Sequence, residues 1–599
     1  MRQLLSLFLR NSIAGLLGVC LLWQSSNAQS IAPTIEWQRS LGGTKGDVAT
    51  SISQTRDGGY IAAGWSRSTN GDVSGHRGYV DAWIVKLTSG GGIEWEKSLG
   101  GSGGDDAYSI TQTSDGGYIV AGRSNSTDGD VSGNHGGYDY WIVKLTSGGA
   151  IEWQKSLGGS DWDWAHSITQ TRDGGYIVAG LSDSNDGDVS GNHGLDDSWI
   201  VKLTSGGVIE WQKSLGGSRN DEARSITQTR DGGYIVAGWS YSTDGDVTGN
   251  HGGADFWIVK LTSSGGIEWQ KSLGGSGDDV APSIAQTSDG GYIVAGESTS
   301  NDGDVSGDHG GEDYWIVKLT SGGEIEWQKL LGGSDFDAAY SITQTRDGGY
   351  IVAGSSESTA GDVSGNHGDY DSWIVKLTSG GGIEWEKSLG GSGVDVSRSI
   401  IQTGDGWYIV AGESESNDGD VRGHHGVSDY TDCWIVKLTN AGTIEWQKSL
   451  GRSLDDIATS IEQTSDAGCI VAGYSSSTDG DVTGHQASTD AWIVKLAPPN
   501  STGVKPTDPP TPSPWAMNAN YPNPFSSTTT ITFTVPERSF VRLSVDTEQG
   551  VEVARLIEEQ LEAGEYRVPF SGDGLASGTY LYRLSSGSTS LVGKMTVVR

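Results

Sequence analysis

Residues 109–122 read Ser-Ile-Thr-Gln-Thr-Ser-Asp-Gly-Gly-Tyr-Ile-Val-Ala-Gly, two short β-type runs joined by Asp115, Gly116 and Gly117. Asp-Gly between such runs is a strong hairpin signal, because glycine accepts the positive φ that the turn needs. Two further β-type runs follow, Tyr140–Leu145 and Ile151–Leu157, and a second glycine-rich turn joins them. The stretch therefore predicts four short antiparallel strands. No segment beyond the N-terminal region shows convincing helical periodicity.

This four-strand unit is repeated along the chain, as two ladders of tryptophan show. The first ladder has a spacing of 58 residues six times and then 61, at Trp37, Trp95, Trp153, Trp211, Trp269, Trp327, Trp385 and Trp446. The second ladder is Trp83, Trp141, Trp199, Trp257, Trp315, Trp373, Trp434 and Trp492. Four antiparallel strands repeated eight times predict an all-β fold, an eight-bladed β-propeller.

The two ends of the repeat region favour a closed ring. The first copy of the Ile-Glu-Trp strand, Ile35–Leu41, precedes the first complete hairpin, and the last unit stops at Trp492–Leu496 without that strand. We expect these two segments to pair, because pairing completes the last unit and removes an exposed edge. The alternative is an open β-solenoid, which would need capping repeats, and none is visible.

The sequence predicts four parts: a signal peptide at 1–28, the propeller at 29–496, a Pro-rich linker at 497–516 and a C-terminal module at 517–599. Arg2 and Arg10 flank a short apolar region, and Ser26–Ala28 has the small-residue pattern of a cleavage site. The apolar region is too short to span a bilayer, and no later segment is apolar enough to do so. The alternative for 1–28 is an N-terminal membrane anchor.

Charge and cysteine content limit the partners. The net charge is −37, and the predicted signal peptide carries two of the arginines and no acid. So acidic a surface repels nucleic acid and anionic lipid and suits cations or neutral ligands, although solubility alone also explains it. Cys433 and Cys469 remain after signal removal, lie in neighbouring units and could form one bridge.

The longest connection in each unit carries a calcium-like pattern. In unit two Asp128, Asp130 and Ser132 stand at positions 1, 3 and 5, and Asp139 stands at position 12. Hard cations take several oxygens from a short, sharply turned loop. The pattern recurs as Asp186/Asp188/Ser190/Asp197, Asp244/Asp246/Thr248/Asp255, Asp302/Asp304/Ser306/Asp313 and Asp479/Asp481/Thr483/Asp490. These residues predict calcium as a possible cofactor. In the alternative interpretation they are turn residues, and the last aspartate caps a strand.

Two other residue types recur. An aspartate precedes the first strand of every unit, at Asp47, Asp105, Asp163, Asp221, Asp279, Asp337, Asp395 and Asp456. We expect it to brace a loop by accepting backbone N–H bonds, with a cation-ligand role as the alternative. A histidine stands in the long loop at His135, His193, His251, His309, His367 and His425. Since each is alone in its unit, we expect these to stabilise turns rather than to bind a metal.

No unique catalytic arrangement is visible. Catalysis needs one asymmetric constellation, whereas these acids recur in every unit, so we predict that the protein is not an enzyme. One irregularity, Asp161 to His166 (Asp-Trp-Asp-Trp-Ala-His), resembles a sugar-stacking patch. The second residue after each Val-Ala (Ala-Ala in unit one) also varies, as binding surfaces do: Trp65, Arg123, Leu181, Trp239, Glu297, Ser355, Glu413 and Tyr474.

The C-terminal module carries three landmarks: Asn520 to Phe525 (Asn-Tyr-Pro-Asn-Pro-Phe), Gly578 to Leu584 (Gly-Thr-Tyr-Leu-Tyr-Arg-Leu) and Lys594 to Arg599 (Lys-Met-Thr-Val-Val-Arg). With these motifs it resembles the type A C-terminal sorting domain of the type IX (Por) secretion system. The resemblance implies an immunoglobulin-like β-sandwich, export through the outer membrane of a Bacteroidetes-type bacterium by the type IX machinery, and removal or surface anchoring of the tail. The repeats resemble the Asp-Gly-Gly-Tyr-Ile-Val-Ala-Gly propeller repeats of such exported proteins, which have no single activity.

The sequence therefore predicts a non-enzymatic protein, secreted or attached to the outer-membrane surface, that binds a glycan or protein ligand or mediates adhesion. Two alternatives stay open, a secreted hydrolase with its site on the acidic long-loop face and a structural matrix component.

Overall fold

A computed structural model describes residues 32–598 except 308, 426–429, 486–488, 499–514, 518–519, 521, 526–527, 537, 548, 562–563, 573 and 588. The predicted signal peptide and most of the predicted linker lie outside these described residues. Every regular element in the described part is a β-strand, which confirms the all-β prediction. Within the same residues no helix has the length and apolarity needed to cross a membrane.

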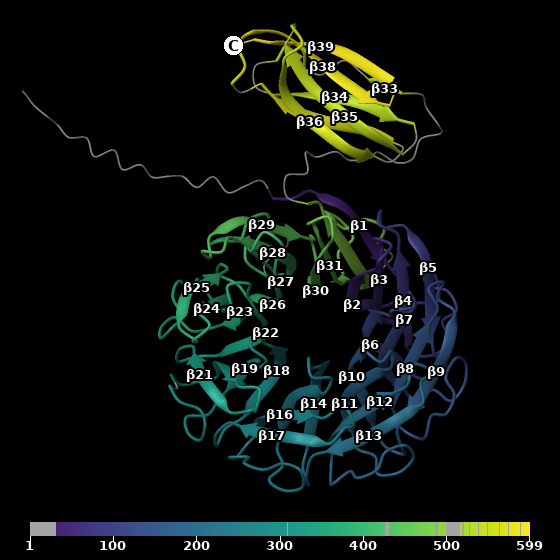
Figure 1. Ribbon diagram of the computed structural model, residues 1–599, viewed down its shortest axis with the longest axis vertical. Coiled ribbons are helices and arrows are strands. Elements are labelled where there is room, and N and C mark those ends of the chain that lie inside the picture. Colours follow the sequence, from purple (N-terminus) through teal and green to yellow (C-terminus); the bar gives the residue numbers. More distant parts are fainter. Residues whose placement is uncertain are drawn as a thin grey trace, which may run out of the picture.

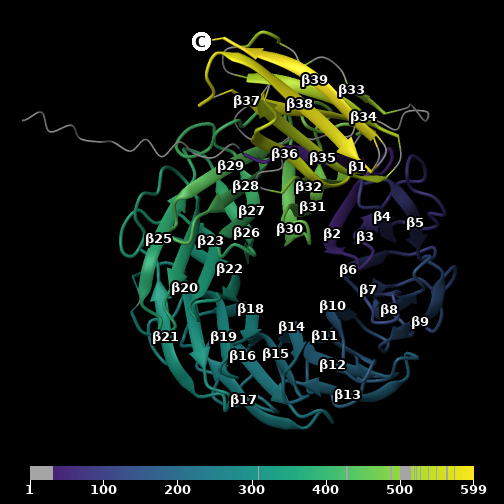
Figure 2. The same ribbon diagram turned by 45° about the horizontal axis from the view of Figure 1, so that its top comes forward.

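Residues 35–496 form four-stranded antiparallel sheets that follow one another around a ring (Figures 1 and 2). We number them as units. Unit 1 is β2 (Asp47–Gln54), β3 (Tyr60–Ser66), β4 (Asp81–Leu87) and β5 (Ile93–Leu99); unit 2 is β6 (Asp105–Gln112), β7 (Tyr118–Ser124), β8 (Asp139–Leu145) and β9 (Ile151–Leu157); unit 3 is β10 (Asp163–Gln170), β11 (Tyr176–Ser182), β12 (Asp197–Leu203) and β13 (Ile209–Leu215); unit 4 is β14 (Asp221–Gln228), β15 (Tyr234–Ser240), β16 (Asp255–Leu261) and β17 (Ile267–Leu273). Unit 5 is β18 (Asp279–Gln286), β19 (Tyr292–Ser298), β20 (Asp313–Leu319) and β21 (Ile325–Leu331); unit 6 is β22 (Asp337–Gln344), β23 (Tyr350–Ser356), β24 (Asp371–Leu377) and β25 (Ile383–Leu389); unit 7 is β26 (Asp395–Gln402), β27 (Tyr408–Ser414), β28 (Asp432–Leu438) and β29 (Ile444–Leu450); unit 8 is β30 (Asp456–Gln463), β31 (Cys469–Ser475), β32 (Asp490–Leu496) and β1 (Ile35–Leu41). Repeated sheets of this kind are the architecture of a β-propeller.

The N-terminal strand closes the ring, as expected. β1 pairs antiparallel with β32, with Ile35 opposite Leu496 and Leu41 opposite Ala491. One hydrophobic cluster then joins unit 8 to unit 1, with Trp37 and Ile470 among its members. The prediction that Ile35–Leu41 completes the last sheet is confirmed.

Glutamine side chains tie each unit to the one before it. Gln112 Oε1 of unit 2 accepts the N–H of Arg56 in unit 1 at 2.9 Å. The same bond recurs around the ring from Gln170, Gln228, Gln286, Gln344, Gln402 and Gln463. Gln54 of unit 1 accepts the Ser465 N–H of unit 8 at 2.7 Å, so the ties run back to the start.

The Asp-Gly-Gly-Tyr turn is held by a lysine that the sequence analysis did not single out. Lys144, on β8, is 2% exposed, and its Nζ lies 3.0 Å from Asp115 and 3.2 Å from Glu152. It also donates to the Leu145 carbonyl at 3.1 Å. Burial raises the pKa of Asp115, but the bonds from Thr113 and Gly117 and the nearby lysine bring it down to about 2. The Asp of the turn, the Lys of the third strand and the Glu of the fourth strand thus form one ionic network.

The first tryptophan ladder joins neighbouring units. Trp153 Nε1 donates to the Ser205 carbonyl of the next unit at 3.2 Å. Its ring packs edge-on against Tyr176, with centroids 5.8 Å apart. The hydrophobic cores accordingly lie between units, each drawing side chains from two neighbouring sheets. A unit cannot bury its faces alone, which explains why the repeat forms a ring.

The C-terminal module has two sheets. One has the order β33 (Ala516–Met517), β34 (Thr528–Val535) and β37 (Gly564–Ser571). The other has the order β36 (Glu552–Leu561), β35 (Ser539–Thr547), β38 (Gly578–Ser586) and β39 (Thr589–Val597). A single hydrophobic core that includes Phe533, Val545 and Met595 fills the module.

The two cysteines of units 7 and 8 do not form the bridge that the sequence left possible. Cys433 and Cys469 are both free and buried in the same hydrophobic cluster. Buried thiols in apolar surroundings act as small hydrophobic residues.

Candidate functional site

Two connections of every unit lie at one end of its strands, which we call the long-loop face. They are the connection into the first strand, such as residues 158–162, and the longer one between the second and third strands, such as 125–138. This geometry follows from the antiparallel order of the strands. The predicted calcium ligands all lie here.

The first position of the calcium pattern bonds to the other connection. Asp128 Oδ1 accepts the Ser102 N–H at 2.6 Å. Asp186, Asp244 and Asp302 repeat this bond with Ser160, Ser218 and Ser276, and Asp479 accepts the Ser453 hydroxyl. At the fifth position Ser132, Ser190, Thr248, Ser306 and Thr483 each bond to a glutamine amide, that of Gln154, Gln212, Gln270, Gln328 and Gln38 respectively.

The last position is inside the protein. Asp139, Asp197, Asp255, Asp313 and Asp490 are all 0% exposed. Asp139 Oδ2 accepts the His135 backbone N–H at 3.0 Å and lies 2.8 Å from His135 Nδ1. Asp197, Asp255 and Asp313 accept the equivalent backbone N–H. The Ser40 hydroxyl donates to Asp490. The last aspartate therefore caps the histidine turn.

The remaining position, the third, faces the neighbouring unit. Asp130 pairs with Arg77 of unit 1. Asp188 Oδ2 lies 3.8 Å from His135 Nε2 of unit 2, and Asp304 Oδ2 lies 4.0 Å from His251 Nε2 of unit 4. Burial lowers the pKa of His193, but Asp197 and then Asp246 raise it above its usual value. Burial, followed by the charges of Asp456 and Asp481, raises the pKa of Asp432.

The four positions thus diverge within each loop. Among the described residues no group of three or more His, Cys, Asp or Glu side chains could hold a metal ion. The hydrogen bonds of the first and fifth positions favour the turn interpretation. In contrast, Oδ1 of Asp139, Asp197 and Asp255 is buried and has no hydrogen-bond partner among the described residues.

The second recurring aspartate braces a loop, as predicted. Asp163 is 0% exposed, and its Oδ2 accepts the Gly159 N–H and the Ser184 hydroxyl, both at 2.9 Å. The same backbone bond recurs at Asp47, Asp105, Asp221, Asp279, Asp337, Asp395 and Asp456. Burial and the neighbouring Asp139 raise the pKa of Asp163 to about 7, against the effect of its hydrogen bonds. The buried carboxyl groups of Asp139 and Asp163 therefore meet at the junction of units 2 and 3, and Oδ1 of each has no hydrogen-bond partner among the described residues.

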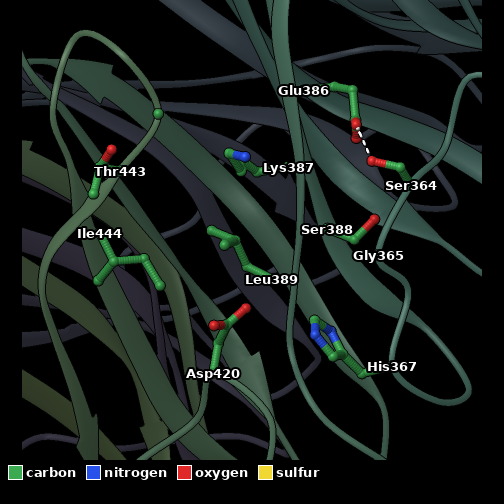
Figure 3. Close-up of a pocket in the computed structure, with 11 residues that line it drawn as sticks. Ser364, Gly365, His367, Glu386, Lys387, Ser388, Leu389, Asp420, Thr443 and Ile444 are labelled. Atoms are coloured by element: carbon green, nitrogen blue, oxygen red, sulfur yellow. Dashed lines mark hydrogen bonds between the residues drawn. The ribbon is translucent and has the colours of Figure 1, made fainter. Parts of the chain in front are cut away.

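Grooves run between neighbouring units on the outer side of the ring. Figure 3 shows the groove between units 6 and 7, with a volume of about 480 Å³ and with His367 and Asp420 on opposite walls. Grooves of about 480 and 430 Å³ occupy the same place between units 2 and 3 and between units 3 and 4. From the sequence, each histidine was expected to act only within its own turn. In the structure its second ring nitrogen faces an aspartate of the next unit. The constant separation of the histidine and that aspartate in the sequence was the signal that could have revealed this pairing.

One cluster on the inner side of the ring breaks the repeat. It lies on the first strands of units 2 to 4, which Figure 1 shows nearest the centre, on the adjoining strand β7 and on the loops beside them. Trp162, 57% exposed, stacks on Trp164 with centroids 5.8 Å apart and planes 15° apart. The Arg123 guanidinium lies over Trp164 at 4.2 Å and over Tyr138 at 4.7 Å. We call these four residues, with Tyr108, His166 and Glu222, the aromatic cluster.

Polar groups surround the aromatic cluster. Asp106 Oδ2 accepts the Arg123 Nε–H at 2.8 Å. His166 Nε2 lies 2.9 Å from Glu222 Oε1, which also pairs with Arg224 at 2.7 Å. Trp164 Nε1 is buried and finds no acceptor among the described residues. Exposed aromatic faces beside donors and acceptors suit the binding of a ligand.

The varying positions predicted from sequence form part of one row across each sheet. Arg123 lies opposite Asp106 on one side and opposite Tyr140 on the other. The corresponding rows read Trp164–Leu181–Ser198 in unit 3 and Glu222–Trp239–Phe256 in unit 4. The neighbouring row is nearly constant, as Ala107–Gly122–Trp141 and Ala165–Gly180–Trp199 show.

The landmarks of the C-terminal module come together in space. The Phe525 N–H donates to the Thr596 carbonyl at 3.0 Å, and the Val598 N–H donates to the Phe525 carbonyl at 2.9 Å. The Asn520 N–H donates to the Tyr582 hydroxyl at 3.1 Å. The first, second and last motifs thus form one structural unit.

Comparison with known proteins identifies the family of the C-terminal module, whereas the ring has only weak matches. The regulatory protein FlaEY of Caulobacter vibrioides is 25% identical over 278 residues, which are 43% of this chain and 28% of that protein. This chain thus spans less than a third of that relative. PorZ, a surface component of the type IX secretion system of Porphyromonas gingivalis, has a TM-score of 0.25 and 12% identity, with coverage of 94% of this chain and 75% of PorZ. Puromycin hydrolase has a TM-score of 0.39 and 11% identity, with coverage of 74% and 62%.

The family described as the secretion system C-terminal sorting domain matches residues 519–598. This match confirms the resemblance carried by the three landmarks, and it implies an interaction with the type IX machinery. Residues 519–598 are therefore a C-terminal sorting domain of the type IX secretion system, and the protein is secreted or attached to the outer-membrane surface.

Proposed function

We propose that this exported protein is an eight-bladed β-propeller with an immunoglobulin-like sorting domain, and that it acts by binding a glycan or protein ligand at the aromatic cluster. The carrying observation is Trp162, which is largely exposed and stacked on Trp164 beside Arg123. Exposed apolar surface that is grouped with other aromatic rings, as that of Trp162 is, marks sites of interaction. Trp, Tyr and Arg are also the residues that dominate binding energy at interfaces.

The varying row supports the same proposal. The eight repeats act as an internal comparison, because they share one fold. A position that only supports packing is under the same demand in every unit, as Gly122 and Trp141 illustrate. Positions such as Arg123 and Leu181 are not under this packing constraint, and their residues differ from unit to unit. Function on a rigid scaffold is expected where such freedom is found.

A binding array tests the proposal. Purified wild-type protein is applied to printed glycans and to printed surface and matrix proteins, together with Trp162→Ala. The matched control is Phe540→Ala, which removes another exposed aromatic ring, on β35 of the C-terminal module. We expect Trp162→Ala to weaken at least one interaction tenfold or more, about 1.4 kcal/mol, and Phe540→Ala to weaken none. The proposal fails if no probe binds or if Trp162→Ala binds every probe as the wild type does.

A secreted hydrolase is the second candidate, and one observation favours it. Glu297 and Glu312 share a hydrogen bond, and burial followed by the charge of Glu312 raises the pKa of Glu297 to about 7. A carboxylic acid kept protonated beside a carboxylate is the pattern of general acid catalysis. Turnover of chromogenic glycosides or peptides that is lost in Glu297→Gln would support this candidate, and absence of turnover leaves the binding proposal.

Calcium stays an untested prediction for the long loops. The hydrogen bonds of Asp128 favour loops that are stable without an ion. The buried Oδ1 of Asp139, which has no hydrogen-bond partner among the described residues, favours a bound cation instead. The response of the melting temperature to chelation decides between the two interpretations.

A further inference from the structure

The grooves between units combine the same chemistry in each copy. Between units 2 and 3 one wall carries His135, Gln154 and Lys155, and the other carries Asp188 and Ile209. Between units 6 and 7 the corresponding residues are His367, Glu386, Lys387, Asp420 and Ile444. Each groove thus offers a cation, a carboxylate, an imidazole and a small apolar surface.

The histidine presents one free nitrogen to the groove. Asp139 engages His135 Nδ1 at 2.8 Å, which fixes the ring and leaves Nε2 facing Asp188. The distance from Nε2 to Asp188 Oδ2 is 3.8 Å, and the equivalent distances are 4.0 Å for His251 with Asp304 and 3.9 Å for His309 with Asp362. These gaps are too long for a direct hydrogen bond. With the imidazole protonated, Nε2–H can donate to a ligand hydroxyl beside the two side chains, and that hydroxyl can donate its own proton to the aspartate carboxylate.

At the junction between units 1 and 2, which we call the plugged junction, an arginine of the chain itself pairs with the aspartate. Arg77 stands in place of the histidine, pairs with Asp130 and donates to the Gly100 carbonyl at 3.0 Å. The aspartate that faces a histidine elsewhere is therefore already neutralised by the chain itself. This junction provides an internal control for any role of the others.

We propose that the grooves between units are repeated binding sites for neutral saccharides, with one sugar hydroxyl bridging the histidine Nε2 and the aspartate of the next unit. The opposite charges of Lys155 and Asp188 suit an uncharged ligand rich in donors and acceptors, and Ile209 offers a surface for its C–H groups. The net charge of −37 further disfavours anionic ligands. Several weak sites on one rigid ring gain avidity for a polysaccharide. These sites are separate from the aromatic cluster.

Affinity electrophoresis of the full-length secreted protein tests the proposal. Native gels contain dextran, starch, galactomannan, xyloglucan or laminarin, and chelator is present so that no calcium effect contributes. The main variant is Asp188→Ala/Asp246→Ala/Asp420→Ala, one change in each groove described above. The matched control is Asp130→Ala, at the plugged junction. Mobilities are expressed relative to gels without polysaccharide, which removes the effect of altered charge.

We expect at least one polysaccharide to retard the wild type. The aspartate triple variant should need at least twofold more of that polysaccharide for the same retardation, whereas Asp130→Ala should be retarded as the wild type is. If the aspartate triple variant has a lowered melting temperature, a second triple variant tests the same grooves from the opposite wall. This variant is Lys155→Ala/Lys213→Ala/Lys387→Ala, and it should show the same loss of retardation. Failure of all five polysaccharides to retard the protein overturns the proposal, and so does equal retardation of both triple variants and the wild type. Trp162→Ala should leave the retardation unchanged, which separates this proposal from that for the aromatic cluster.

Discussion

The buried aspartates at the unit junctions predict that the protein becomes less stable as the pH rises from 5 to 8. Burial raises the pKa of Asp139 and Asp255 to about 6, and that of Asp163, Asp197, Asp395 and Asp432 to about 7. The ordinary value is 3.8. Between these values the folded chain holds protons that the unfolded chain has released. The stabilisation is therefore complete below about pH 4 and is lost as the pH rises through 6 to 7.

The size of the effect follows from the shifts. A shift of about 3 pKa units at Asp163 corresponds to roughly 4 kcal/mol between its protonated and ionised forms. Each retained proton makes the free energy of unfolding fall by about 1.4 kcal/mol per pH unit. His193 and His367 act in the same direction, because their aspartate partners outweigh burial and raise their pKa values. We expect the melting temperature to fall by at least about 5 °C from pH 5 to pH 8.

Differential scanning calorimetry across this range, with Asp163→Asn beside the wild type, measures the effect. Asparagine keeps an acceptor for Gly159 and Ser184 but cannot ionise, so the variant should lose less stability between pH 5 and 8. Asp161→Asn, a neighbouring exposed aspartate, serves as the control and should follow the wild type. A melting temperature that is flat or rises over this range would refute the reasoning.

Three further predictions use the same structure. Lys144→Met should lower the free energy of unfolding by about 1–3 kcal/mol, because it removes the buried donor to the Leu145 carbonyl, while the half-exposed Asp115 and Glu152 regain water; chemical denaturation measures this, and Lys155→Ala, on the groove surface, should cost far less. Deletion of residues 517–599 should leave the ring in the periplasm, as fractionation and immunoblotting would show, and normal surface delivery would contradict the assignment. Chelation should leave the melting temperature unchanged, since the side chains at the first and fifth loop positions already bond within the protein and no described group of three ligands converges; a fall that millimolar calcium reverses would instead support the calcium prediction.

The sequence was sufficient to predict the repeated sheets because the controlling signals are local. Asp115-Gly116-Gly117 defines a turn, and Gly116 has a φ of +88° with open space around it, as the hairpin interpretation requires. The pairing of Ile35–Leu41 with Trp492–Leu496 could also be predicted, because a missing strand at one end matched a surplus strand at the other. Both inferences need only the order of elements along the chain.

Contacts between units were much harder to predict. The calcium interpretation assumed that Asp128, Asp130 and Asp139 converge, as spacing within one loop suggests. In the structure Asp128 turns to the preceding connection, Asp130 to the previous unit and Asp139 to the interior. Spacing reports which residues are near in sequence, whereas the orientation of each side chain depends on the strand ends that surround it.

Ring closure itself explains where function can reside in this fold. Each unit must match two neighbours, so any position that packs between units is constrained in every copy at once. Positions that pack within a unit are constrained in every copy as well: a Cβ at Gly122 would lie 1.9 Å from the Asp106 carbonyl oxygen of the same unit. Arg123, one residue further along the same strand, is not limited in this way. It forms a cation–π contact with Trp164, and no other unit in the described residues has this arginine–tryptophan pair at the equivalent positions. Variation is thereby confined to the inner end of the long-loop face, while the constant outer grooves are repeated. A single asymmetric site and a set of equivalent sites can therefore coexist on one ring, and the two sets of variants proposed above separate them.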